Sequence, residues 1–153
     1  MAGQLNSRFR AAEESPGLLL WQLTNRWQAA QRAALKPFGI THVQFVLLAS
    51  LTWLAGGEPI TQRRLSEHAA TDVMMTSQVL RALEQRGLLV RKPHPSDGRA
   101  HALAATADGI ALANRAIVAV ERCDREFFAP LGDGSSFARD LRALLRSDAA
   151  RTG

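Results

Sequence analysis

The stretch from residue 61 to residue 106 restricts the possible folds of this chain more than any other. Apolar residues recur there at helical spacing, stop at a glycine, and give way to two short apolar runs around a basic, proline-containing loop. In chain order, the pattern predicts a helix over 61–70, a helix over 72–86, a strand over 88–90, a loop over 91–99 and a strand over 100–105. Two helices joined by a tight turn and followed by a two-stranded ribbon form a winged helix-turn-helix.

Long helices flank this unit on both sides. Ser15 followed by proline predicts a helix start. Thr41 and Gln44 fit a capping box for a helix that is apolar over most of its surface, so we expect that helix in the centre of the core. Thr106 is the expected cap of a third long helix. These helices are predicted from 16 to about 36, from 41 to about 55, from 106 to about 128, and from about 137 to 149.

The outer helices are longer than an isolated winged helix requires. We expect the segments 15–40 and 107–149 to pack across a two-fold axis as the dimerisation helices of a homodimer. The segment 41–106 is then a winged-helix DNA-binding lobe, and 1–153 is a single domain. The predicted fold is mainly α with a small β-ribbon, in which N- and C-terminal helices form a dimerisation region.

The composition is compatible with DNA as a binding partner but does not require it. The chain has 153 residues, of which 46% are apolar, and its formal net charge of +5 favours a polyanionic partner. Its one cysteine, Cys123, excludes a disulfide framework within the chain and favours a reducing compartment. We see no secretory pattern and no apolar run long enough to span a bilayer, so a cytoplasmic protein without a membrane partner is expected.

Four stretches of the chain resemble the MarR family, the multiple-antibiotic-resistance regulators of bacteria. They are KPFGITHVQFVLL at 36–48, LRALEQRGLLVR at 80–91, the wing SDGR at 96–99, and ATADG at 105–109. The similarity covers roughly residues 15–149. It implies a dimeric regulator of transcription, more often a repressor than an activator, that binds a pseudo-palindromic operator. It also implies that a small ligand or an oxidant acting near the dimer interface changes the affinity for DNA.

The helix over 72–86 is the expected reading helix. At about 100° per residue, one side is expected to face the core, namely Val73, Thr76, Leu80 and Leu83. Gln78 can form two hydrogen bonds with the major-groove edge of adenine, and the two methionines can contact thymine methyl groups. Many MarR members carry an arginine where Gln78 falls, which implies a different operator preference here. The candidates for DNA contact on this helix are Met74, Met75, Thr76, Ser77, Gln78 and Arg81; the alternative is a face that is only solvated.

The wing carries most of the other basic residues that are candidates for DNA contact. Arg91, Lys92 and Arg99 are candidate DNA contacts, with Arg99 expected in the minor groove. Asp97 is expected to hold Arg99 or another arginine in a fixed pose by charge-assisted hydrogen bonds, or only to form the hairpin turn with the glycine after it. Weaker candidates for phosphate contact lie on the preceding helix, namely Arg63, Arg64 and Ser66.

A sensing site is less clearly marked. The aromatic residues and the histidine of the first two long helices could bind a small aromatic or phenolic effector, with Trp21, His42, Phe45 and Trp53 as candidates and Trp27 nearby. The alternative is that these residues are plain core. Cys123, with Arg122 and Arg125 as neighbours in sequence, is either a redox sensor or a small packing residue.

Other classes of function find no support in the sequence. The four histidines are scattered without metal-ligand spacing, and neither a phosphate-binding glycine loop nor a nucleophile elbow is present. We therefore expect no enzyme, no cofactor and no metal. The remaining alternative to a DNA-binding regulator is a winged-helix protein–protein adaptor, which salt-dependent DNA binding would distinguish.

Overall fold

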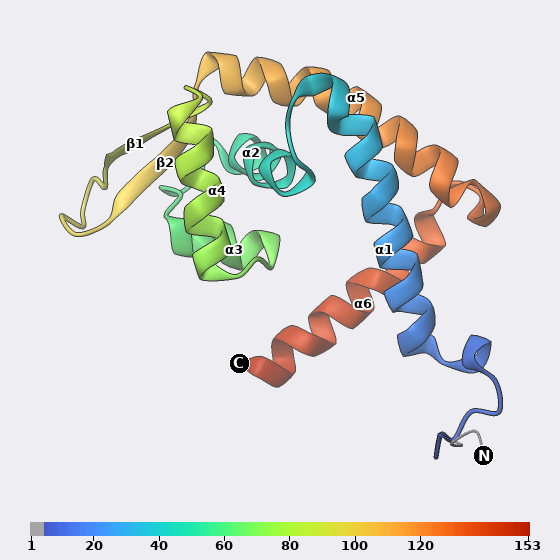
Figure 1. Cartoon of the computed structure of the whole chain (residues 1–153). Coiled ribbons are helices and arrows are strands. Elements are labelled where there is room, and N and C mark those ends of the chain that lie inside the picture. Colours follow the sequence, from blue (N-terminus) through green and yellow to red (C-terminus); the bar gives the residue numbers. More distant parts are fainter. Residues whose placement is uncertain (1–4) are drawn as a thin grey trace.

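The computed structural model describes residues 5–153, so part of the predicted unit 1–153, residues 1–4, lies outside the described residues. The described part is mainly helical, with one two-stranded antiparallel sheet (Figure 1). This confirms the predicted winged helix-turn-helix with additional outer helices. In chain order the elements are α1 (Pro16–Leu35), α2 (His42–Leu54), α3 (Gln62–Ala69), α4 (Val73–Gln85), β1 (Leu89–Pro93), β2 (His101–Ala105), α5 (Ala107–Phe128) and α6 (Ser135–Thr152).

Helix α2 is the centre of the core, as predicted. The Thr41 hydroxyl accepts the Gln44 N–H at 3.2 Å, and the Gln44 side-chain oxygen accepts the Thr41 N–H at 3.0 Å, which completes the capping box. Leu47, Leu48 and Leu51 are essentially inaccessible to solvent. Because α3, α5 and β2 all contact this helix, its burial holds the lobe together.

The helix-turn-helix is set by local capping. Thr61 starts α3 by accepting the Arg64 N–H, and Asp72 starts α4 by accepting the Met75 N–H. Between the two helices the chain reverses at Ala70, which adopts a left-handed conformation with φ 53°. The turn is therefore only a few residues long, and α4 lies across α3 at the surface of the lobe (Figure 1).

The first strand of the ribbon is longer than predicted, whereas the second begins one residue later than predicted. β1 and β2 pair antiparallel over five residues each. The first strand extends beyond the predicted 88–90 because Arg91 and Lys92 continue the pairing with β2 instead of entering the tip. The tip of the wing is thus limited to 94–100, between the two strands.

Thr106 joins the ribbon to α5. Its hydroxyl donates to the Gly87 carbonyl at 2.7 Å and accepts the Gly109 N–H at 3.1 Å, while its own N–H donates to the Leu88 carbonyl at 3.0 Å. The start of α5 crosses the start of the ribbon so closely that a β-carbon on Gly109 would lie 2.0 Å from the Leu88 carbonyl oxygen. Only glycine fits at this crossing.

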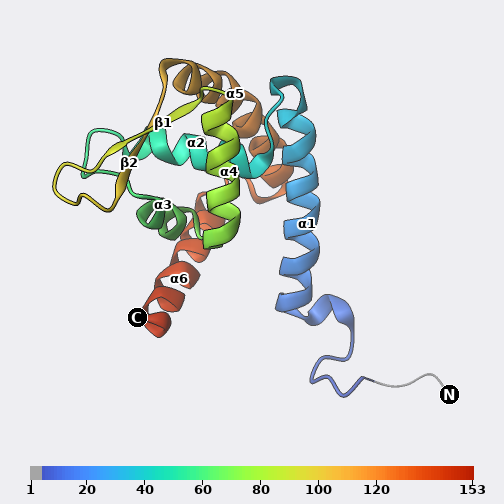
Figure 2. The same cartoon turned by 60° about the vertical axis from the view of Figure 1, so that its left-hand side comes forward.

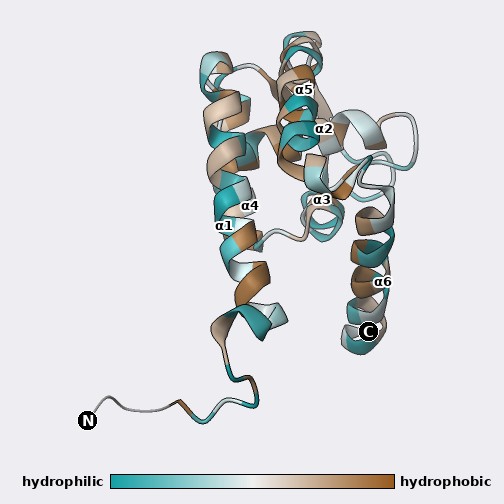
Figure 3. Cartoon of the chain, turned by 90° about the vertical axis from the view of Figure 1, so that its right-hand side faces the viewer, coloured by the Kyte–Doolittle hydropathy of each residue, from teal (hydrophilic) through white to brown (hydrophobic). Residues whose placement is uncertain are grey.

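The outer helices keep much apolar surface exposed. Only Gln31 and Leu35 are buried in α1, and no residue is buried in α6. Hydrophobic turns are visible on both helices (Figure 3). The exposed leucines are Leu18, Leu19, Leu20 and Leu23 on α1 and Leu141, Leu144 and Leu145 on α6. Within residues 5–153 no single helix is long and apolar enough to cross a membrane; only Pro16–Phe38 and His42–Leu54 together, bent by 77°, reach that length and composition.

Candidate nucleic-acid interface and effector pocket

The outward side of α4 carries the predicted base-reading residues. The helix stands at the surface of the lobe, with the ribbon extending to one side of it (Figure 2). Met74 is 74% exposed and precedes the exposed Gln78 by about one turn, and Met75 is 40% exposed. Val73 was predicted in the core but is 64% exposed, because it is the first residue of the helix and its side chain extends past the helix end.

Thr76 cannot contact DNA from its position, which corrects its place among the candidates. It is fully buried, its hydroxyl donates to the Asp72 carbonyl at 2.7 Å, and it lies 2.7 Å from the Thr71 hydroxyl. It therefore stabilises the turn between α3 and α4. The half-buried Ser77 receives the Arg81 guanidinium, whose Nε and Nη2 donate to the Ser77 carbonyl and hydroxyl at 3.3 Å each. Arg81 is thus folded back along its own helix.

The tip of the wing is ordered by Asp97 and His94. The Asp97 carboxylate accepts the Arg99 backbone N–H at 3.0 Å. The His94 Nδ1 atom accepts the backbone N–H groups of Ser96 and Asp97 at 3.1 Å each. Asp97 therefore shapes the hairpin tip and does not hold the Arg99 guanidinium, contrary to the fixed-pose prediction. Arg99 remains exposed at the tip.

Arg91 points toward α4. Its Nε lies 3.1 Å from a carboxylate oxygen of Glu84, with three quarters of its side chain covered. Arg91 therefore links β1 to α4 and its DNA contact stays a prediction, whereas Lys92 beside it is exposed. The weaker candidates on α3 are also engaged locally: Arg63 with Glu67, Arg64 with the Glu58 carbonyl, and Ser66 with the Arg63 carbonyl.

A polar network joins α1 to α5 beneath the lobe. One oxygen of Asp124 accepts two hydrogen bonds, from Trp27 Nε1 at 2.8 Å and from Gln31 Nε2 at 2.7 Å. Gln31 is fully buried, and its side-chain oxygen has no hydrogen-bond partner among the described residues. Nothing in the sequence indicated these partners of Asp124 on α1, which lie about 90 to 100 positions away.

The network reaches α2 through an aromatic contact. The rings of Trp27 and His42 meet edge to face, with centroids 5.1 Å apart. Burial lowers the pKa of His42 below its usual value; the Asp124 carboxylate opposes this shift and Arg32 adds to it. Because His42 is the first residue of α2, this contact connects the outer helices to the core helix of the lobe.

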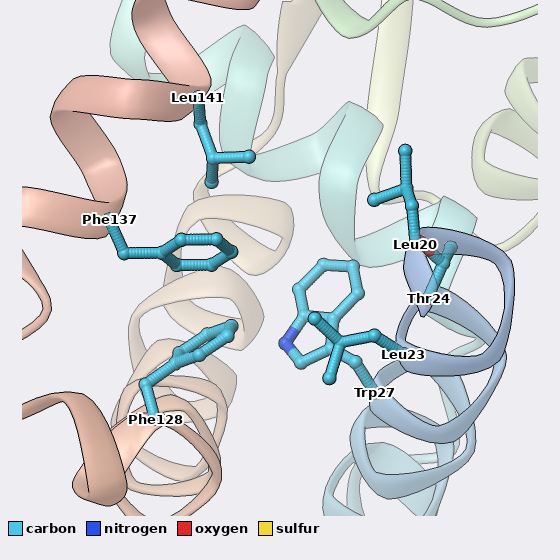
Figure 4. A pocket seen from close by; sticks show the side chains of 7 residues that line it. All are labelled: Leu20, Leu23, Thr24, Trp27, Phe128, Phe137 and Leu141. Carbon is cyan, nitrogen blue, oxygen red and sulfur yellow. The ribbon is translucent and has the colours of Figure 1, made fainter. Parts of the chain in front are cut away.

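An apolar hollow of about 220 Å³ lies between the outer helices, next to this network. Phe128 and Phe137 face Trp27 across the hollow, as Figure 4 shows. Its remaining lining residues are Leu20, Leu23, Thr24 and Leu141. Trp27 therefore takes part in both the hollow and the polar network, which gives the hollow a physical connection to α2.

The structure does not bring the predicted effector residues together. Phe45 is buried in the core, which makes it a packing residue. Trp21 and Trp53 are exposed, and His42 lies behind Trp27; none of the four lines the hollow. The phenylalanines that do line it were missed because they lie about 100 residues further along the chain, where only packing reveals their position.

Cys123 lies in surroundings that disfavour a redox role. Burial raises the pKa of its thiol, and the carboxylates of Asp124 and Glu126 raise it further. A redox-sensing cysteine needs a stabilised thiolate, so this environment favours the packing alternative. Among residues 5–153 we find no group of three or more histidine, cysteine or acidic side chains arranged to hold a metal ion.

A helix-turn-helix that exposes its second helix beside a basic wing defines the class of winged-helix regulators of transcription. Residues 40–101 match the model of the MarR family. Over 144 residues the chain is 40% identical to an HTH-type transcriptional regulator of Bacillus subtilis, covering 94% of this chain and 98% of the relative. An HTH-type transcriptional repressor of Mycobacterium tuberculosis is 34% identical over 78% of this chain and 85% of its own length. The chain belongs to the MarR family, which consists of transcriptional regulators and not of enzymes.

Solved structures agree with this assignment. CouR of Rhodococcus jostii, crystallised with p-coumaroyl-CoA, superposes with a TM-score of 0.80 at 28% identity, over 92% of this chain and 96% of that one. A MarR variant of E. coli in complex with operator DNA gives a TM-score of 0.74 at 25% identity, over 88% and 94% of the two chains. The resemblance recognised in the sequence is therefore confirmed at the level of family and fold.

Proposed function

We propose that this chain is a homodimeric repressor of transcription that binds a pseudo-palindromic operator and responds to a small aromatic effector. One observation carries the DNA-binding part: the exposed face of α4, with Met74 and Gln78, lies in a lobe whose wing presents Arg99 at its tip. This geometry allows α4 to enter a major groove while the wing reaches the neighbouring minor groove. The related E. coli protein was crystallised with operator DNA, which supports the proposal.

The contacts have distinct roles in this proposal. Gln78 bonds an adenine edge, and the exposed Lys92 and Arg99 neutralise backbone charge or enter the minor groove. Ser77, beside Gln78, contacts phosphate if Arg81 releases its hydroxyl. Repression is proposed because the Mycobacterium tuberculosis relative is named a repressor.

The dimer is proposed from the exposed leucines of α1 and α6. Leu144 and Leu145 are exposed in the single chain although they repeat at helical spacing with Leu141, which is the pattern of a helix face that packs against a partner. A second copy of the chain is the proposed partner, with 15–40 and 107–149 as dimerisation segments and 41–106 as the reading lobe. Two lobes related by a two-fold axis would then meet two half-sites of one operator.

The proposed function is tested by selecting binding sites from random duplex DNA with the full chain. An enriched inverted repeat, bound with an affinity that falls steeply with salt, is the expected result. A folded protein that shows no salt-dependent binding to any duplex would contradict the proposal and favour the protein–protein adaptor.

Arg99→Ala is expected to weaken binding to the selected duplex about tenfold. It is also expected to reduce the slope of log binding constant against log salt concentration by about one unit for each subunit. The physical reason is the loss of one cation from the exposed wing tip, which makes no contribution to the core. Titrations at several salt concentrations measure both quantities. The control is Arg10→Ala, which removes the same charge from the exposed segment before α1 and should leave the slope unchanged. Equal slopes for the two variants would contradict the wing contact.

The effector is proposed to bind in the hollow beside Trp27. Its lining is almost entirely apolar and includes three aromatic rings, which suits a small aromatic compound. CouR was crystallised with p-coumaroyl-CoA, an aromatic ligand, which supports this chemical class. Because Trp27 also contacts His42 at the start of α2, a ligand that shifts its ring would shift the reading lobe.

Thr24→Phe is expected to abolish the response to effector while leaving DNA affinity within about twofold, because the added ring fills the hollow. The probes are p-coumarate and p-coumaroyl-CoA, added to the complex with the selected duplex. Gln22→Phe, on the exposed and opposite side of α1, is the matched control and should respond like the wild type. A wild-type complex that neither these probes nor other small aromatic acids dissociate would contradict the effector site.

A further inference from the structure

The first turn of α4 carries an exposed apolar patch formed by Val73, Met74 and Met75. All three side chains are exposed. Three consecutive exposed apolar side chains at a helix start are unfavourable in water unless a partner covers them. Val73 belongs to the patch because it is the first residue of α4 and its side chain extends past the helix end.

The polar groups around the patch are already engaged. The Asp72 carboxylate accepts a backbone N–H of the first turn at 2.9 Å. The Arg81 guanidinium is bound to the carbonyl and hydroxyl of Ser77. Guanine is read by arginine or lysine donors, and here the arginine on this side of α4 is turned back along the helix. The groups left to meet base edges are the patch and the Gln78 amide.

The major groove offers one apolar group, the C5 methyl of thymine. We infer that the patch of Val73, Met74 and Met75 is a reader of pyrimidine C5 methyl groups, so that thymine is recognised by its methyl and not by its O4 atom. It follows that 5-methylcytosine, which carries the same methyl at the same place, keeps the methyl contact at these positions, whereas cytosine loses it. The inference rests on the proposed DNA-binding function and names the chemistry that α4 selects.

The Gln78 amide adds a second preference for the same base pairs. Met74 and Gln78 are four residues apart, so they lie side by side on the outward face of α4. An amide pairs bidentately with adenine, while the patch covers the thymine methyl of the same or the next base pair. The half-site read by α4 is therefore a run of A·T pairs.

The experiment uses the duplex that the full chain selects from random DNA. Thymines under α4 are replaced by deoxyuridine, which removes only the methyl group. The affinity is expected to fall about fourfold for each contacted methyl removed. Replacement of the same T·A pairs by C·G should weaken binding further, and 5-methylcytosine in place of that cytosine should restore about fourfold for each methyl returned.

A variant locates the effect on the patch. Replacing Val73, Met74 and Met75 together by alanine should bring the affinity ratio between thymine and deoxyuridine duplexes close to one, because all the side chains that cover the methyl are gone. Trp53→Ala, at an exposed tryptophan of α2, is the control and should keep the wild-type ratio. Equal wild-type affinities for the two duplexes would overturn methyl reading and leave the DNA-binding function intact. The absence of salt-dependent binding to any duplex would overturn the proposed function and the inference with it.

Discussion

Gly109→Ala is expected to destabilise the protein by about 3 kcal/mol and to lower Tm by about 10 °C. In an ordinary helix this change is favourable by about 1 kcal/mol, since alanine has the higher helix propensity. Here the new β-carbon would lie 2.0 Å from the Leu88 carbonyl oxygen and 3.2 Å from a methyl of Leu48. The Leu88 carbonyl cannot move freely because it accepts the Thr106 N–H at the joint between ribbon and α5.

Thermal and urea unfolding of Gly109→Ala measure this cost. Gly17→Ala is the matched control: this glycine also lies in the first turn of a helix, but the nearest atom to its added β-carbon is 4.0 Å away. The control should be neutral or more stable than the wild type. A Gly109→Ala variant within 0.5 kcal/mol of the wild type, on the order of an ordinary surface substitution, would show that the joint can relax.

Leu144→Glu is expected to convert the protein to a monomer and to lower its affinity for the selected duplex about 100-fold. Leu144 is 66% exposed in the single chain, so a glutamate there is tolerated by the isolated fold. In the proposed dimer the same carboxylate would be buried without a partner, which is strongly unfavourable. A monomer binds one half-site only. It therefore loses the gain in affinity that comes from linking two binding events, which is about 10²–10⁴-fold.

Light scattering of the purified variants measures the mass, and titration with the selected duplex measures the affinity. Ala143→Glu provides the control, because it adds the same charge to the exposed opposite side of α6. We expect that control to stay dimeric and to bind DNA. A dimeric Leu144→Glu variant would mean that the leucines of α6 are not the interface, and the exposed leucines of α1 would then be the next test.

The sequence predicted the helix starts well because capping is local chemistry. The Ser15, Thr41 and Thr106 side chains each accept a backbone N–H three residues later, as their spacing indicates. The family resemblance was also readable, since the wing and the helix exits form contiguous motifs. Periodicity identified α2 as the core helix, because apolar residues on every side of a helix leave no face for solvent.

Periodicity failed where burial depends on neighbours from other elements. Helical spacing places Val73 on the core-facing side of α4, but the residue lies at the helix end, where no other element covers it. Arg91 looked like part of a charged loop, yet the ribbon continues through it and its guanidinium meets Glu84. Thr76 was a surface candidate whose hydroxyl is used inside the turn.

The residues of the candidate site also fall into two groups, those predicted from the sequence and those placed only by the packing of the helices. The sequence by itself predicted which helix reads DNA and determined which residues charge the wing, because these follow from helical phase and from a short motif. Only the tertiary structure placed Phe128 and Phe137 opposite Trp27, and only it brought Asp124 to Gln31. Such contacts join residues about 90 to 110 positions apart, and their geometry is fixed by how α1, α5 and α6 pack, which no local pattern encodes.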